Sequence, residues 1–229
     1  MKLILFDIDG TLVNTGGAGS RAFSRALETT FGLSGGLNGV RLDGKTDLQI
    51  VREVFQRQGL CLEVSEESAR ELFGSYVEFL EGELDEVGLQ YQVLPGVSEL
   101  LSDLNCNPAF LLGIASGNIA EGARLKLEKG RLNKFFPIGG FGSDAESRTE
   151  LIRIAIQRAA EYVNPGQLNS VTVIGDTPRD ISHGQEAGAR VIAVASGFYT
   201  LNQLKECRPN LAVESLSPIE PVLEFLNAE

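Results

Sequence analysis

Short, uninterrupted runs of apolar residues recur along the chain, and each is bounded by Gly, Asp, Asn or Pro. Continuous runs of this kind are typical of strands buried on both faces of a parallel sheet. The pattern therefore predicts a parallel sheet. Its strands are expected at residues 3–6, 110–115, 171–174 and 191–194, with weaker candidates at 135–138 and 211–213.

The segments between these runs have helical periodicity. Helices are expected over 118–129, which begins with a residue type favoured at N-caps, over 149–162, and from near Asp180 to Gly188. Strands that alternate with helices in this way indicate an α/β fold with a doubly wound sheet.

Residues 16–91 have a different pattern, because they contain no comparable apolar run. Amphipathic helices are expected there over 22–31, 47–58 and 65–82. The chain enters this block through Gly16, Gly17 and Gly19 and leaves it near Pro95-Gly96. We therefore expect a core formed by residues 1–15 and 92–229, and a helical cap formed by residues 16–91.

The charge of the chain limits its partners. With 31 Asp and Glu against 20 Lys and Arg, the net charge is −11, and such a field repels nucleic acids and anionic membranes. It also repels an anionic substrate, so phosphate chemistry would require a local cation. No stretch approaches the roughly 18 apolar residues of a membrane span, and the run before Asp7 is too short for a signal sequence.

The cysteines indicate a reducing compartment. Cys61, Cys106 and Cys207 are far apart and odd in number, so they form neither a CxxC pair nor a disulfide framework. We expect three small apolar residues in a cytoplasmic protein.

Two aspartates follow the first predicted strand. Asp7 and Asp9 stand at positions i and i+2, so they project to the same side of an extended backbone. They lie at the end of the strand where open α/β sheets bind ligands. Gly10 then allows a turn that brings the backbone close to a ligand. The alternative is a polar turn after a strand.

Asp176 and Asp180 form a second acidic group, again after a predicted strand and a glycine. Carboxylates delivered to one crevice from two strands repel each other unless a hard cation lies among them, and oxygen ligands favour Mg²⁺. The sequence therefore predicts Mg²⁺ as a cofactor. Asp180 could instead be the N-cap of the following helix, a role compatible with an outer position at the metal.

A third predicted strand ends at Ser116-Gly117-Asn118. A hydroxyl followed by glycine and a helix N-terminus is suited to binding phosphate, and this makes the three residues candidates for contact with substrate. An ordinary turn and helix cap is the alternative.

Together these segments resemble the haloacid dehalogenase superfamily, specifically its phosphatases with a helical cap inserted after the first motif. The resemblance spans essentially the whole chain, and its specific part is Asp7-Ile-Asp-Gly-Thr-Leu12 combined with the later Gly175-Asp-Thr-Pro-Arg-Asp180. Within this branch the chain looks most like enzymes of the phosphoglycolate phosphatase type. The resemblance implies a Rossmann-like core, a cap that closes over substrate, Mg²⁺ as cofactor, and hydrolysis of a small phosphorylated metabolite.

The resemblance also implies roles for single residues. Asp7 matches the nucleophile that becomes an aspartyl-phosphate, and Asp9 matches the general acid that protonates the leaving oxygen and then activates water. Thr11 stands at the position that helps to hold Asp9. Ser116 and the Gly117 amide match donors to the phosphoryl oxygens.

The implied metal ligands are the Asp7 carboxylate, the Asp9 backbone carbonyl and Asp176, with Asp180 orienting bound waters. A phosphate dianion is repelled by the Asp7 carboxylate that must attack it. Mg²⁺ and one basic side chain would together cancel this repulsion.

That basic side chain is expected to be Arg148. The superfamily commonly has a lysine on the helix before the last acidic motif, but no lysine occurs here between Lys134 and Lys205. A guanidinium stays charged and can bind phosphate through two donors. The alternative is a surface arginine in the first turn of a helix.

Lys45 is the only lysine between Asp7 and Pro95, in the predicted cap. Related capped phosphatases place a glycine-bearing loop at this point into the active site, so Lys45 is a candidate for binding an anionic substrate group. A solvated loop lysine before the helix N-cap Thr46 is the alternative.

Four other functions stay open at this point. A halide-removing enzyme usually lacks the second acid of the first motif, so Asp9 argues against it. A phosphonate hydrolase would use a cap lysine, for which Lys45 is available, and a sugar phosphomutase shares the nucleophile and the acid. A non-catalytic phosphate-binding protein on the same fold is a further alternative, although both acids are intact.

Overall fold

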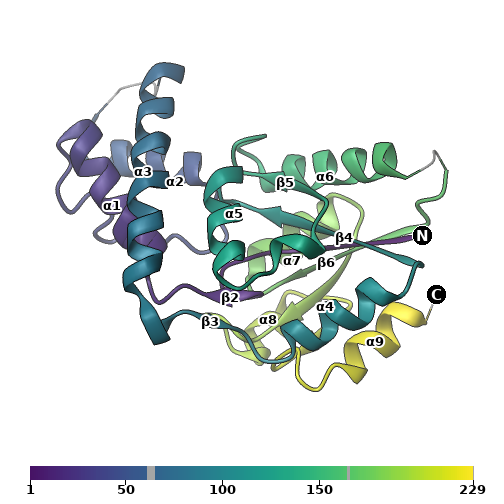
Figure 1. The fold of residues 1–229 in the computed structure, drawn as a ribbon. Coiled ribbons are helices and arrows are strands. Elements are labelled where there is room, and N and C mark those ends of the chain that lie inside the picture. The colour runs from purple at the N-terminus through teal and green to yellow at the C-terminus, as the bar shows by residue number, and fades with distance from the viewer. Residues whose placement is uncertain (61–64, 164–165, 229) are drawn as a thin grey trace.

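The computed structural model describes residues 1–60, 65–163 and 166–228 of the 229-residue chain. Its centre is a six-stranded sheet in which neighbouring strands are parallel. The strands are β1 (Lys2–Phe6), β4 (Phe110–Ser116), β5 (Ile138–Phe141), β6 (Ser170–Gly175), β7 (Arg190–Val194) and β8 (Leu211–Val213). Their spatial order is β5–β4–β1–β6–β7–β8 (Figure 1).

The chain changes direction across the sheet at β1. From β1 it passes to β4 and β5 on one side, and then crosses to β6, β7 and β8 on the other. Phe6, the last residue of β1, is aligned with Ile114 of β4 and Ile174 of β6. The three strands end within two residues of this aligned row. The segments that follow them therefore leave the sheet at the same edge, at the switch point where open α/β sheets bind ligands.

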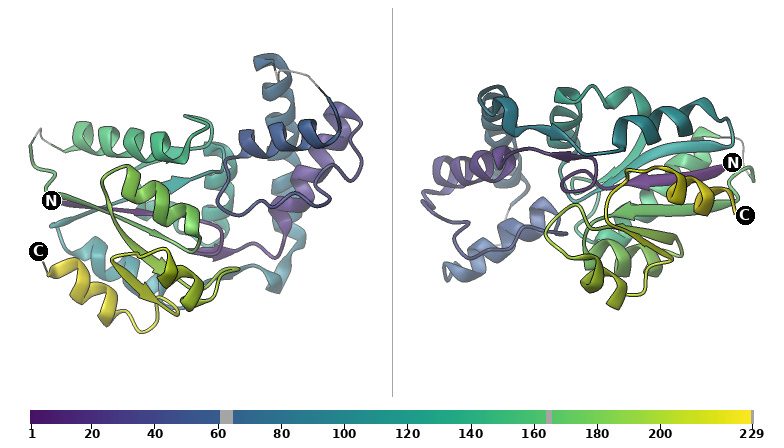
Figure 2. Two further views of the ribbon diagram at one scale, coloured as in Figure 1. Left: turned by 180° about the vertical axis from the view of Figure 1, so that it is seen from behind. Right: turned by 90° about the horizontal axis from the view of Figure 1, so that it is seen from below.

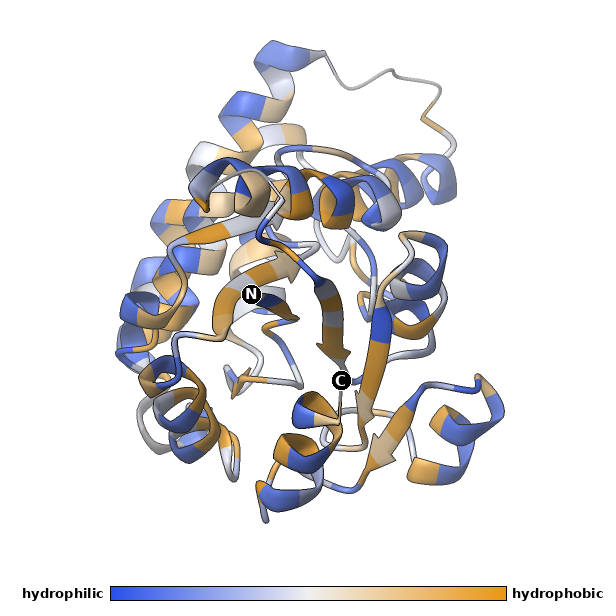
Figure 3. Ribbon diagram, turned by 90° about the vertical axis from the view of Figure 1, so that its right-hand side faces the viewer, coloured by the Kyte–Doolittle hydropathy of each residue, from blue (hydrophilic) through white to orange (hydrophobic). Residues whose placement is uncertain are grey.

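Two layers of helices cover the sheet (Figure 2). They are α4 (Val97–Cys106), α5 (Ala120–Lys129), α6 (Arg148–Tyr162), α7 (Pro178–Glu186), α8 (Leu201–Glu206) and α9 (Glu220–Asn227). Side chains of β1 alternate between the layers: Ile4 and Phe6 pack with α4, α5 and α9, whereas Leu3 and Leu5 pack with α6, α7 and α8. Burial on both faces explains the continuous apolar runs, and Figure 3 shows these strands mostly in the hydrophobic colour.

Three further helices are inserted between β1 and β4 and lie beside the sheet (Figure 1). They are α1 (Ala18–Phe31), α2 (Asp47–Arg57) and α3 (Glu66–Glu86). They share an apolar cluster that includes Phe23, Leu72 and Tyr76. The two connections to this insertion meet where β2 (Val13–Asn14) pairs antiparallel with β3 (Gln92–Val93).

The predicted fold class, a Rossmann-like α/β parallel sheet with an inserted helical cap, is confirmed. The strand expected over 135–138 is displaced: Asn133–Phe135 forms a short 3₁₀ helix and β5 begins at Ile138. Glycines in β5 interrupt the apolar run that would have marked it. The helix expected from residue 118 begins at Ala120, and α4, α8 and α9 were not predicted.

Cys106 is exposed at the end of α4, and Cys207 is half-buried after α8; both are free thiols. The third cysteine, Cys61, lies outside the described residues. Across the described ranges, no helix combines the length and the apolarity that crossing a membrane requires.

A substitution at Gly140 in β5 can test how closely α6 packs on the sheet. A Cβ at this position would overlap the backbone carbonyl of Leu151. Gly140→Ala is therefore expected to lower the free energy of unfolding by about 1–3 kcal/mol, because overpacking pushes the helix from the sheet. The matched control is Gly74→Ala in α3, where a Cβ meets nothing within 4 Å and alanine favours the helix by about 1 kcal/mol. Denaturant unfolding measures both; equal stabilities would contradict the close packing.

Candidate active site

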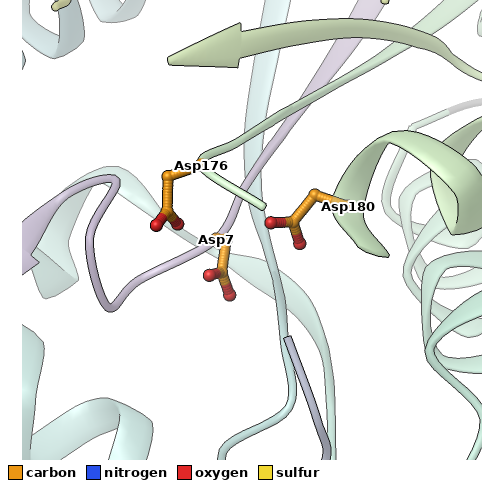
Figure 4. Close-up of side chains that lie close together, drawn as sticks. All are labelled: Asp7, Asp176 and Asp180. Carbon is orange, nitrogen blue, oxygen red and sulfur yellow. The ribbon is translucent and has the colours of Figure 1, made fainter. Parts of the chain in front are cut away.

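Three aspartates meet at the edge of the sheet where β1 and β6 end. Asp7 directly follows β1, Asp176 directly follows β6, and Asp180 lies in the first turn of α7. All three are buried, and an oxygen of each lies within 4.8 Å of an oxygen of the others. Figure 4 shows their carboxylates turned toward one space. The structure thus brings together the side chains of three of the four predicted metal ligands.

The turn after Asp9 requires a glycine. Gly10 has a φ of 82°, a conformation that L side chains rarely adopt, and a Cβ there would overlap the Asp176 carboxylate. The next residue, Thr11, is buried, and its hydroxyl donates to Asp176 Oδ1 (3.1 Å). This corrects the expected partner of Thr11, which was Asp9, because the turn places the hydroxyl toward the end of β6.

The start of α7 fixes Asp180. The N-cap is Thr177, whose amide donates to Asp180 Oδ2 (3.0 Å) while its hydroxyl accepts from the Asp180 amide (3.2 Å). This reciprocal arrangement is a capping box, and Pro178 occupies the first helical position. Asp180 is therefore the third residue of the helix and not its N-cap. Its carboxylate belongs to the capping box as well as to the aspartate cluster.

Arg148 places a buried guanidinium among these carboxylates. Its Nη2 lies 3.3 Å from Asp7 Oδ1 and also contacts Asp180 Oδ1. Burial lowers the pKa of a guanidinium, but the charges of Asp180 and Asp7 outweigh this and raise the pKa of Arg148, so it stays charged. The alternative of a surface arginine is wrong, since Arg148 is 4% exposed.

The cluster carries more negative charge than Arg148 neutralises. Burial raises the pKa of Asp7 to about 6, a rise that Arg148 opposes and Asp180 enlarges. Burial and the charge of Asp180 also raise the pKa of Asp176 well above its ordinary value. Unpaired charge in such a site costs several kcal/mol. A divalent cation removes this cost, and carboxylate oxygens are the donors that Mg²⁺ prefers, so the residues present fit Mg²⁺.

Asn118, after the end of β4, joins two parts of the site. Its Nδ2 donates to Ser116 Oγ (2.9 Å) and to Asp9 Oδ2 (2.8 Å). The residue type of Asn118 suggested an N-cap, but these hydrogen bonds leave its side chain engaged elsewhere, so it does not cap α5. The backbone amide of Ile119, before α5, instead donates to Asp47 Oδ2 of α2 (2.8 Å).

The loop at Gly117 is in direct contact with the segment that begins α2. A Cβ on Gly117 would overlap the carbonyl of Lys45, and the Gly117 carbonyl accepts from the Asp47 amide (2.9 Å). The hydroxyl of Thr46 donates to the carbonyl of Glu146 (3.0 Å), before α6. These contacts hold the inserted helices against the carboxyl edge of the sheet.

The ammonium of Lys45 is engaged within the insertion. It pairs with Glu53 of α2 and donates to the carbonyl of Arg41 (2.6 Å). Only 13% of its side chain is exposed, so it is not a solvated loop lysine. Contact of Lys45 with a substrate stays a prediction.

Lys126 on α5 is a site residue that the sequence patterns did not single out. Its ammonium donates to Asp9 Oδ2 (2.6 Å) and to Asn118 Oδ1 (2.6 Å), and the residue is 4% exposed. A signal exists in the sequence, because Lys126 shares the buried face of its helix with Ala123 and Leu127. A lysine on such a face indicates a buried partner.

A cavity of about 850 Å³ lies between the edge of the sheet and the insertion. Of the predicted site residues, all except Thr11 and Asp180 line it. Phe23 and Tyr76 of the insertion and the exposed Phe198 add apolar surface to its walls. The volume and the mixture of apolar and charged walls suit a small metabolite.

Comparisons with known proteins show which family and fold this chain shares. The profile of haloacid dehalogenase-like hydrolases matches residues 4–194. Pyrophosphatase PpaX of Bacillus cereus (strain G9842) is 24% identical over 229 residues, which cover 99% of this chain and 98% of that protein. CbbY from Rhodobacter sphaeroides, in complex with phosphate, has a TM-score of 0.71 at 17% identity over 95% of both chains. A predicted phosphoglycolate phosphatase from Haemophilus somnus has a TM-score of 0.67 at 18% identity, covering 97% of this chain and 98% of that one.

Metal binding at the aspartate cluster should depend on pH. Burial raises the pKa of Asp7 from 3.8 to about 6, and it raises the pKa of Asp176 as well. Between pH 3.8 and about 6, the folded, metal-free protein therefore holds protons at these carboxylates that the unfolded chain has released. The stability that the Asp7 proton contributes is fully present below the ordinary pKa of 3.8 and is lost as pH rises through about 6. The raised pKa of Asp176 acts in the same direction. Because Mg²⁺ competes with the protons, it should raise the Tm more at about pH 7.5 than at about pH 5.

Thermal unfolding in Mg²⁺ or EDTA measures this difference. At about 100 times the Kd, binding contributes about 2.7 kcal/mol, or about 5–10 °C for a chain of this size. Asp176→Asn should lose most of the shift at the higher pH, whereas the control Asp85→Asn, an exposed acid on α3, should keep it. An equal shift at both pH values would contradict the expectation.

Proposed function

Because this chain belongs to the haloacid dehalogenase-like hydrolase family, whose profile matches residues 4–194, we propose that it is a Mg²⁺-dependent phosphatase. Its substrate would be the phosphate monoester of a small metabolite, and its intermediate an aspartyl-phosphate on Asp7. The observation that carries the proposal is the convergence of Asp7, Asp176 and Asp180 around one buried guanidinium. Buried like charges cost stability, and strongly shifted carboxyl groups in a cleft support a catalytic role.

The proposed reaction has two steps. The Asp7 carboxylate forms a bond to phosphorus while the bond to the leaving oxygen breaks and its electron pair stays with that oxygen. Asp9 donates a proton to the leaving oxygen. Asp9 then accepts a proton from a water molecule that attacks phosphorus, which frees Asp7 and releases phosphate.

The surrounding residues would neutralise the charge of the phosphoryl group. Bound Mg²⁺ supplies electrostatic stabilisation of the phosphoryl oxygens; the Asp7 and Asp176 carboxylates and the Asp9 carbonyl would hold it, with Asp180 in an outer position. Arg148 lies against Asp7 and supplies a fixed positive charge. The Ser116 hydroxyl and the amide after it would donate to the remaining phosphoryl oxygens.

The inserted helices would act as a cap over the substrate. In this proposal the cap comprises residues 16–91, the core comprises 1–15 and 92–229, and the substrate occupies the cavity between them. Lys45 could bind an anionic part of the substrate from the cap side. We also propose that the protein is cytoplasmic, as the pattern of its cysteines led us to expect.

Among the alternatives, a phosphonate hydrolase is disfavoured because the Lys45 amine that it would need is paired with Glu53. A sugar phosphomutase shares Asp7 and Asp9, and a non-catalytic protein would have no use for both acids. The name of the Bacillus relatives supports testing pyrophosphate beside phosphoglycolate and sugar phosphates. Phosphate release from this panel, with Mg²⁺ or EDTA, separates the candidates.

Asp7→Asn is expected to abolish turnover of p-nitrophenyl phosphate and of the best metabolite in the panel, since an amide cannot act as the nucleophile. Phosphate release at saturating Mg²⁺ measures this, and a thermal melt confirms the fold. The control Asp85→Asn should retain full activity, because its side chain is 80% exposed on α3. Undiminished turnover by Asp7→Asn would overturn the nucleophile assignment.

Arg148→Ala is expected to lower kcat/KM by two or more decades, the scale for removing a donor to transition-state charge. The control Arg153→Ala removes an exposed guanidinium from the same helix and should leave kcat/KM unchanged. Arg148→Lys keeps a charge in the site and should retain more activity than the alanine variant. A loss below about threefold in Arg148→Ala would mean that another cation has this role.

A further inference from the structure

A second charged cluster lies in the cavity beside the aspartates. Lys126 donates to Asp9 Oδ2 and to Asn118 Oδ1, each at 2.6 Å. Asn118 Nδ2 donates to the same Asp9 oxygen at 2.8 Å. The three side chains therefore form a closed set of hydrogen bonds, and the roles proposed so far make no use of Lys126.

The ammonium of Lys126 is enclosed by both parts of the molecule. A Cβ on Gly19 of α1 would lie 3.2 Å from Nζ. Tyr76 of α3 and Asp47 of α2 interact electrostatically with the same ammonium. Burial lowers its pKa, but the charge of Asp9 and these neighbours outweigh burial and raise it, so Lys126 stays charged. Its side chain has little room to turn away from Asp9.

The two oxygens of Asp9 have different surroundings. Oδ2 accepts from both Lys126 and Asn118, whereas Oδ1 accepts no hydrogen bond from any residue in the described ranges. The side chain of Asp9 is 43% exposed and lines the cavity. Neither Arg148 nor Thr11 replaces these partners, because the first contacts Asp7 and Asp180 and the second contacts Asp176.

We propose that Lys126, together with Asn118, is a positioning residue for Asp9: the pair holds Oδ2 and presents Oδ1 to the oxygen that leaves phosphorus. This inference rests on the proposed phosphatase function. In the first step Oδ1 carries the proton and Oδ2, as the carbonyl oxygen, accepts from both donors; the proton passes to the leaving oxygen as its bond to phosphorus breaks. In the second step Oδ1 accepts a proton from the attacking water.

If Lys126 positions the general acid, the effect of losing Lys126 on kcat/KM should depend on the basicity of the leaving oxygen. Protonation by a general acid matters most when the leaving oxygen is strongly basic and contributes typically 10²–10⁴-fold. A nitrophenolate leaves without a proton, whereas a phenolate benefits from one. Loss of the positioning residue should therefore affect phenyl phosphate more than p-nitrophenyl phosphate. A merely structural role would affect both compounds equally.

The test is Lys126→Met, which keeps the length of the side chain and removes its charge. We expect kcat/KM for phenyl phosphate to fall at least about tenfold more than kcat/KM for p-nitrophenyl phosphate, with most of the loss in kcat. Lys129→Met is the matched control: its side chain is 33% exposed on the same helix, and both substrates should be unaffected.

Asn118→Ala removes one donor to Oδ2 of Asp9 while Lys126 remains. It should also lower kcat/KM more for phenyl phosphate than for p-nitrophenyl phosphate, but with a smaller difference between the two compounds. It keeps the inference testable if Lys126→Met does not fold. Equal losses on the two compounds, no loss, or a rise in KM with kcat unchanged would each overturn the positioning role. A wild-type protein that releases phosphate from neither compound and from no member of the metabolite panel would instead overturn the proposed function, and this inference with it.

Discussion

The crowding of negative charge at the end of β1 is the constraint on which the rest of the site depends. Parallel pairing with β6 in register brings Asp7 and Asp176 out of the sheet side by side, and the capping box of α7 adds Asp180. Two unit charges 4 Å apart interact by about 4 kcal/mol at an effective dielectric constant of about 20. Arg148 offsets part of this repulsion. The negative charge that remains suits a cation that prefers oxygen ligands, such as the Mg²⁺ proposed here.

The inserted helices supply polar groups that the core lacks. The N-terminus of a helix leaves backbone amides without partners, and at α5 one of them is satisfied by Asp47 of the insertion. Asp47 is itself buried, and burial raises its pKa to about 6. Gly117 allows the backbone of the insertion to approach the end of β4. The position of α2 is therefore coupled to the start of α5, which carries Asn118 before it and Lys126 within it.

The parts of the site that sequence could predict are those fixed by local chemistry. Asp7, Asp176 and Ser116 were predictable because each follows an apolar run, and the ends of parallel strands meet at one edge. The partner of Thr11 was not, because its direction depends on the turn at Gly10. The contact of Lys126 with Asp9 was hidden because it is distant in sequence: the helix was predicted, but the carboxylate that Lys126 contacts lies 117 positions away. Likewise, the apolar run of β5 is interrupted at Gly140, where the absence of a side chain allows α6 to pack closely on the strand.

The two buried cations of the cavity have different shapes, and the difference suits the tasks that we propose for the carboxylates they contact. A planar guanidinium can contact two carboxylates at once, and Arg148 does so with Asp7 and Asp180. This favours the ionised form of Asp7, which the proposed attack on phosphorus requires. Lys126 is a compact ammonium on one oxygen of Asp9, which leaves the other oxygen able to exchange a proton. A guanidinium spanning both oxygens of Asp9 would block that exchange, so the choice of lysine at this position follows from the chemistry proposed for Asp9.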